Sequence, residues 1–153
     1  MSSQHCLFPF IEKANQETID LLLEARSYAQ TIRKQGPNAP PPSRQLLINS
    51  EVMRMILRLA SVMAWIMERK AAPPPSDRPR KDGKKEQALS DNALCMDANG
   101  SDDARLPLEL RALLRNSHRL YVRVSRLDNM MRKGPDKIDP REIGEFTAPL
   151  VGH

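Results

Sequence analysis

Apolar residues recur at steps of three and four in three separate stretches of the chain, a spacing typical of amphipathic α-helices. The first stretch covers about 9–34 and ends at Gly36-Pro37, which a helix does not easily continue through. The second covers about 44–71 and stops before consecutive prolines, and the third covers about 107–133. No run of β-branched or aromatic residues alternates with polar ones. We therefore predict an all-α fold.

The three predicted helices are similar in length, so each would span roughly 40 Å. Helices of equal length favour an elongated up-down-up three-helix bundle, which we expect over residues 8–133. Pro9 suits the first turn of its helix, and Ser43 is placed to cap the next one. Residues 36–43 read GPNAPPPS and are expected to form a stiff, extended connector.

The remaining segments have few apolar and many charged residues. Residues 72–105 separate the second helix from the third, and their low hydrophobicity and high charge predict a long, flexible, disordered insert. Within the insert, residues 86–96 have the spacing of a transient helix, because Leu89, Ala93 and Met96 share a face. Residues 134–153 are expected to form a flexible C-terminal tail that does not fold alone.

The second predicted helix is apolar over most of its circumference, more than one bundle face can bury. Two explanations stay open, a thick bundle core and a homodimer interface. The dimer interpretation assigns the interface to Val52, Met55, Ile56, Leu59 and Met63. We do not expect this helix to span a membrane, because arginines interrupt its apolar block.

Composition and charge narrow the function further. The chain has 153 residues, with 24 Lys and Arg against 19 Asp and Glu, which gives a net charge of +5. Its two cysteines, Cys6 and Cys95, lie far apart, and no secretory signal precedes them. We therefore expect reduced thiols and a cytoplasmic location.

The sequence holds no pattern that we would assign to catalysis. Neither GxGxxG nor GxxxxGK[ST] occurs, and no histidine pairs with a cysteine at metal-ligand spacing. Ser117 and His118 are adjacent and point about 100° apart on a helix, which makes them unsuitable as nucleophile and base. We therefore predict a protein that is not an enzyme, needs no cofactor or metal and has no small-molecule substrate.

Five arginines of the third predicted helix are candidate partner-binding residues: Arg111, Arg115, Arg119, Arg123 and Arg126. The first four, which we call the arginine ridge, are spaced at i, i+4, where like charges destabilise a helix. Our first interpretation is that an acidic row on the first helix, Glu17, Asp20 and Glu24, balances them. An acidic partner protein is the second interpretation. Nucleic acid is the third, since no interleaved aromatic residues or helix-turn-helix accompany the ridge.

Three groups of residues form a recognisable series along the chain: Glu24-Ala25-Arg26 with Tyr28; Glu51, Met53, Arg54, Arg58, Leu59 and Trp65; and Leu120-Tyr121, Arg123-Val124 and Arg126-Leu127-Asp128. Together they resemble the RcdA-like family of alphaproteobacteria, named for a regulator of CtrA degradation. The chain departs from the family pattern at Val52, where the pattern has Ser, and at Ile56-Leu57, where it has small hydroxyl residues. A more apolar second helix predicts a drier interface.

The resemblance implies a dimeric helical bundle without catalysis. It further implies an adaptor that helps the AAA+ protease ClpXP degrade cell-cycle substrates. The implied partners are the protease, its other adaptors and the protein substrates. Such a protein raises the local concentration of a substrate at the protease, for which two binding surfaces suffice. The alternative is a nucleic-acid-associated helical protein that uses the arginine ridge and the basic segment RPRKDGKK of the insert.

Overall fold

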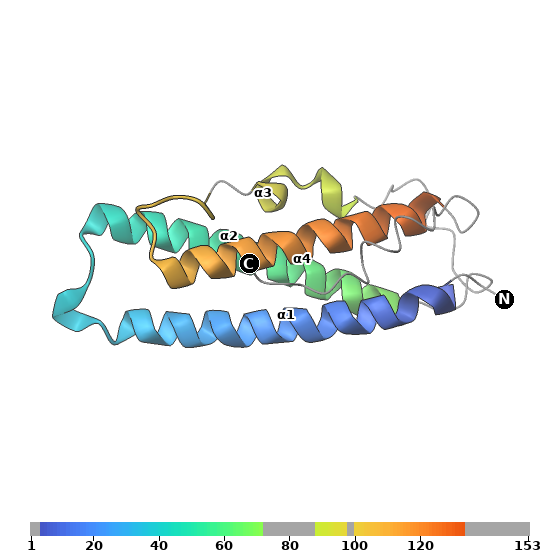
Figure 1. Ribbon diagram of the computed structural model, residues 1–153, viewed down its shortest axis with the longest axis horizontal. Helices are drawn as coiled ribbons and strands as arrows, with labels where there is room; N and C mark the ends of the chain where they lie inside the picture. The colour runs from blue at the N-terminus through green and yellow to red at the C-terminus, as the bar shows by residue number, and fades with distance from the viewer. Residues whose placement is uncertain (1–3, 72–87, 98–99, 134–153) are drawn as a thin grey trace.

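The computed structural model describes residues 4–71, 88–97 and 100–133, and Figure 1 shows their arrangement. Three long helices pack side by side: α1 (Gln4–Arg33), α2 (Pro42–Ala71) and α4 (Leu108–Lys133). Three short helical turns accompany them: η1 (Gly36–Asn38), η3 (Leu89–Asp91) and α3 (Ala93–Met96). The described ranges contain helices and no strand, so the predicted all-α fold is confirmed.

The helix ends differ in detail from those predicted. Because α1 begins at Gln4, Pro9 lies inside the helix, where it removes one backbone hydrogen bond, rather than in the first turn. α2 begins at Pro42, whose missing N–H costs nothing at that position, so Ser43 is not its cap. Gly36 follows α1 with a φ of 50°, and residues 36–38 form a 3-10 turn in place of the predicted extended connector.

The three long helices do not alternate in direction, and the predicted up-down-up order is wrong. Arg58 of α2 donates to the Leu114 carbonyl of α4, and further along both helices Trp65 donates to Asp128. α2 and α4 therefore run in the same direction, and α1 runs against both (Figure 1). The physical reason is the connection over residues 72–107, which is long enough to cross back to the other end of the bundle, as some helical bundles do.

The described part of the insert packs on the bundle, which corrects the prediction of a wholly disordered segment. Its residues run along α2 and α4 on the side away from α1 (Figure 1). Cys95 is only 1% exposed, and Leu106 is buried as well. Average hydrophobicity missed this because a few apolar side chains anchor a segment that is otherwise polar. The predictions of flexibility for residues 72–87 and for the tail at 134–153 concern residues outside the described ranges.

The core is formed by one apolar stripe from each long helix. Typical members are Ile11 and Leu21 of α1, Val62 of α2, and Leu114 and Val124 of α4, all buried. α2 presents a second apolar face, but no helix of the described ranges is long and apolar enough to cross a membrane.

Candidate protein-interaction surfaces

The side of α2 that points away from the bundle is apolar, and we call it the outward face. It carries five large side chains that are between 41% and 72% exposed: Leu46, Met53, Ile56, Leu57 and Met67. Ala60 and Ala64, both exposed, lie among them. Contiguous exposed apolar surface of this kind usually marks a protein interface.

The outward face has the spacing of a coiled-coil seam. Its positions 46, 50, 53, 57, 60, 64, 67 and 71 are separated alternately by four and three residues. An average step of about 3.5 residues keeps a stripe facing one partner helix along its whole length. The core side of α2 carries its own stripe, so this helix is suited to being covered on two sides.

The structure divides the five residues predicted for the dimer interface. Met55 and Leu59 are 1% and 0% exposed and belong to the bundle core, so their assignment to an interface with a second copy is wrong. The reason is helical phase, because these two positions point toward α1 and α4 while Ile56 points outward. Val52 and Met63 are half-buried at the border between the two sides.

Two exposed apolar residues of α1, Ile19 and Leu23, extend this surface. Glu12, which lies on the same side of α1, pairs with Lys70 of α2 at 2.6 Å. In the antiparallel register that this ion pair sets, Ile19 is level with Met63 near the border of the outward face. The apolar surface therefore spans parts of two helices.

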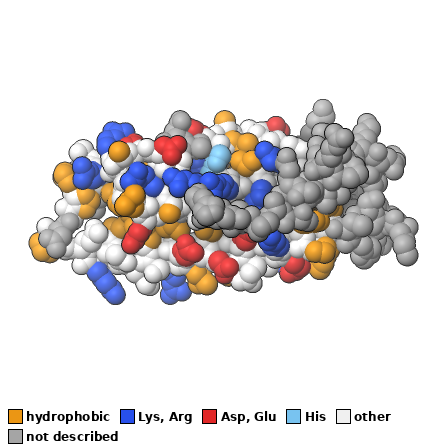
Figure 2. All heavy atoms as spheres, in the orientation of Figure 1, with side chains coloured by type: hydrophobic (Ala, Val, Ile, Leu, Met, Phe, Trp, Pro, Cys, Tyr) orange, Lys and Arg blue, Asp and Glu red, His pale blue; other side chains and the backbone are white. Residues whose placement is uncertain are grey.

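The arginine ridge does not lie on one surface. Each step of four residues turns the next side chain about 40° further around the helix, so the ridge winds about α4. Arg115 lies 3.8 Å from Asp102 of the insert, whereas Arg123 pairs with Glu17 of α1. Figure 2 shows the basic side chains over α4 above the acidic side chains over α1. Two of the ridge arginines are thus engaged within the chain.

The predicted balance by the acidic row is found at Glu17. Asp20 of the same row accepts a hydrogen bond from Gln16 on its own helix at 3.0 Å. Arg119 and Arg126 are exposed and stay candidates for contact with an acidic partner.

Residues 88–97, which we call the strap, occupy a groove between α2 and α4. Side chains of α4 bind the main chain of the strap. The Tyr121 hydroxyl donates to the Leu89 carbonyl at 2.6 Å, and the Asp128 carboxylate accepts from the Leu89 N–H at 3.2 Å. His118 Nε2 lies 2.8 Å from the carbonyl oxygen of Met96. This strap groove therefore recognises a backbone more than a particular sequence.

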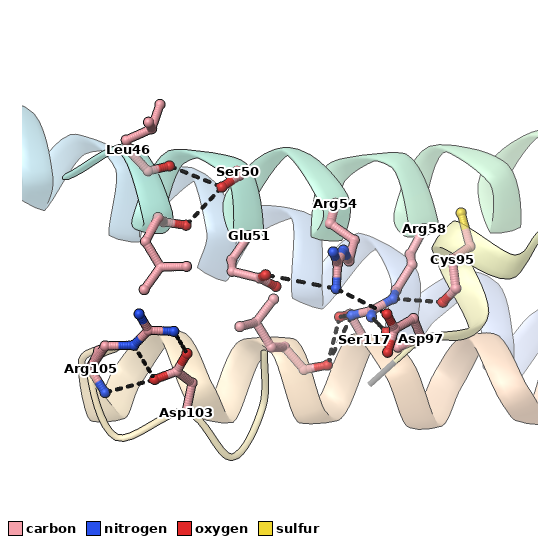
Figure 3. A network of polar contacts seen from close by, with 12 residues as sticks. Leu46, Ser50, Glu51, Arg54, Arg58, Cys95, Asp97, Asp103, Arg105 and Ser117 are labelled. Carbon is pink, nitrogen blue, oxygen red and sulfur yellow. Dashed lines mark hydrogen bonds and ion pairs between the residues drawn. The ribbon is translucent and has the colours of Figure 1, made fainter. Parts of the chain in front are cut away.

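Arg58 of α2 closes the other end of the strap groove and is only 1% exposed. Its Nε donates to the Cys95 carbonyl at 2.8 Å, and its guanidinium also donates to the Asp97 carbonyl and reaches two oxygens of α4 (Figure 3). Burial lowers the pKa of Arg58 from its ordinary value, and neighbouring Arg54 lowers it further. Strap carbonyls therefore supply much of the polar environment that this buried cation needs.

Asp128 anchors the opposite end and is 0% exposed. Besides the Leu89 N–H it accepts from Trp65 Nε1 at 3.0 Å and from Arg132 Nε at 3.0 Å. Arg69 of α2 lies 3.4 Å from the same carboxylate and 5.4 Å from the centre of the Trp65 ring. One buried carboxylate thus joins α2, α4 and the strap. The burial that surrounds it also raises the pKa of Tyr121.

Gly100 brings the segment after the strap into close contact with α2. A Cβ at this position would overlap the carboxylate of buried Glu51. Residues 101–106 then lead to a cleft of 390 Å³ between the end of α1 and the starts of α2 and α4, lined in part by Tyr28, Arg44 and Arg105. Among the described residues, neither this cleft nor any other place gathers three side chains able to hold a metal ion.

Four of the residues that carry the family resemblance hold the strap: Arg58, Trp65, Tyr121 and Asp128. Sequence reasoning missed this role. The available signal was a set of polar residues on the core stripe of α4, namely Ser117, Tyr121, Ser125 and Asp128, all buried in the structure. Polar groups on a core-facing stripe need partners, and here the strap supplies several of them.

Comparison with protein families gives one match. The model of a family described as a protein of unknown function, DUF1465, matches residues 6–150 and so covers the three long helices and the strap. Comparisons with curated proteins and with solved structures give no match.

Proposed function

The chain belongs to the DUF1465 family, and we propose that it is a non-enzymatic adaptor, acting as a homodimer, that promotes regulated proteolysis of cell-cycle substrates by ClpXP. Its proposed partners are this protease, the other adaptors of the protease and the substrates themselves. The proposed place of action is the cytoplasm. The resemblance to RcdA-like proteins suggests the protease, and the outward face of α2 is the observation that carries the proposal of an interaction protein.

The outward face suits a second copy of itself. In an antiparallel pair of α2 helices related by a two-fold axis, seam positions meet in pairs: Leu46 with Ala71, Ser50 with Met67, Met53 with Ala64, and Leu57 with Ala60. Each large side chain then faces a small one, which lets the two helices approach closely and interdigitate. A two-fold interface requires such self-complementarity.

A dimer gives an adaptor two copies of every other surface. Two linked binding sites raise the effective concentration of a bound protein at its partner without any new contact. Exposed Arg119 and Arg126 on α4, in a chain of net charge +5, fit a partner with acidic side chains. We favour a protein over nucleic acid here because Arg115 and Arg123 are engaged by carboxylates of the chain itself.

The test is capture of the protease from the native cytosol. The immobilised full chain should enrich ClpX and ClpP in mass spectrometry, together with proteins that are not part of the protease. ATP added to the washed complex should lead to degradation of a captured protein while the chain stays intact. Arg119→Glu should weaken the capture, and Arg26→Glu, a matched change at an exposed arginine of α1, should not.

Two results would contradict the proposal. A folded chain that enriches neither ClpX nor ClpP at physiological salt is not an adaptor of this protease. A chain that is itself degraded when ATP is added is a substrate and not an adaptor.

A further inference from the structure

The connection between α2 and α4 is not forced into the strap groove by its length. Residues 72–107 run beside α4, a helix of 26 residues that spans about 40 Å. A chain of this many residues reaches on the order of 120 Å when extended. The connection is therefore roughly three times longer than the gap it bridges, and the seat of the strap in the groove reflects binding.

The strap is bound as a peptide ligand is bound. At one end, Tyr121 and Asp128 engage the carbonyl and the N–H of Leu89. At the other end, a single helical turn, α3, presents its last carbonyls to Arg58 and His118. A cation at the C-terminal end of a helix is electrostatically favoured.

Few strap side chains take part. Leu89 and Met96 are half-buried, and Cys95 is the one strap side chain that is fully buried. An Asp97 carboxylate oxygen lies 3.7 Å from Arg54 of α2. The four residues 91–94 between the two ends are exposed. The groove therefore asks for apolar residues at the first, seventh and eighth positions of a segment and an acidic residue at the ninth.

The groove keeps its need for a ligand when the strap leaves. Arg58, Tyr121 and Asp128 are buried polar residues whose strap contacts go to main-chain atoms, which any peptide offers. Without the strap, these groups have to be solvated by water or by another segment. A segment of similar pattern would satisfy them in the same way.

We propose that the strap groove is a peptide-docking site, that the strap fills it as a ligand within the same chain, and that a partner segment with the pattern of the strap displaces it. This inference goes beyond the adaptor function, and its test contains no protease. A ligand tethered in the same chain competes at a high effective concentration, so the site is available to a partner only when the strap is loosened or the partner is concentrated.

The experiment measures binding of a fluorescent peptide with the sequence of residues 88–106 to the full chain by anisotropy. Cys95→Asp places a charge in the buried strap position and should loosen the strap. Leu89→Asp does so at the other end. The matched control is Leu94→Asp, an adjacent change at an exposed strap residue. A peptide with the same residues in scrambled order controls for charge.

We expect the peptide to bind the Cys95→Asp and Leu89→Asp chains at least roughly tenfold more tightly than the unaltered chain or the Leu94→Asp chain. Adding Arg58→Met to either loosened chain should abolish the binding. Circular dichroism should show retained helix in both loosened chains. The proposal is overturned if the peptide binds no folded variant or binds all chains equally. It is also overturned if both loosened chains lose their helices, because the strap is then part of the core.

Discussion

At the scale of single residues, buried polar groups decide where the insert lies. Burial of Arg58 and Asp128 costs free energy unless their hydrogen-bonding atoms are satisfied. The two long helices supply part of the partners, and the strap main chain supplies the rest. A polar residue on a core-facing stripe is therefore a signal of a hidden partner, although the sequence does not say which segment provides it.

The arginine ridge gives a test of the same kind at individual positions. Arg123 pairs with Glu17, with side chains 22% and 20% exposed, whereas Arg119 is exposed. Arg123→Gln should lower the free energy of unfolding by about 1 kcal/mol, because the partly buried carboxylate of Glu17 loses its partner. Arg119→Gln should change it by less than about 0.5 kcal/mol. Urea denaturation of both variants measures the difference, and equal losses would mean that the ridge is balanced as a whole.

At the scale of elements, α2 has two apolar stripes with different roles. One stripe, with Met55, Leu59 and Val62, is covered by the bundle. The other follows the outward face and has nothing from the described parts of the chain over it. Apolar excess in the sequence indicated that such a helix needs two partners, but it did not separate the two stripes. The alternating steps of four and three along positions 46–71 would have done so.

Self-association through the outward face predicts the effect of one charge at its centre. Ala60→Glu places a carboxylate where two copies of α2 approach closely and should convert the dimer to a monomer. Ala112→Glu makes the same change at an exposed alanine of α4 and should leave the dimer intact. Light scattering at tens of micromolar should give a mass close to 17.3 kDa for the first variant and about twice that for the second and for the unaltered chain.

An unaltered chain that is monomeric at this concentration would contradict the assignment of the interface. So would an Ala60→Glu variant that remains dimeric while Ala112→Glu behaves in the same way.

At the scale of the whole molecule, the sequence predicted the fold class and the three long helices, but not their directions. Hydrophobic periodicity says which side of a helix is buried, and it carries no information on whether a neighbour runs up or down. Direction follows here from the long connection, whose return past Asp128, Arg58 and Glu51 places the start of α4 beside the start of α2. The interaction surfaces were predicted in part, because helical phase distinguishes Ile56 from Met55 only once the core is known.

The central claim is that this bundle delivers other proteins to ClpXP, and protein half-lives in the native cells test it most directly. Pulse-labelling with mass spectrometry compares cells that contain the chain, cells that lack it, and cells that carry Ala60→Glu. We predict that a limited set of proteins lives longer without the chain, that the unaltered chain restores their turnover and Ala60→Glu does not, and that loss of ClpX stabilises the same set. Unchanged half-lives, or a stabilised set that does not depend on ClpX, would contradict the account.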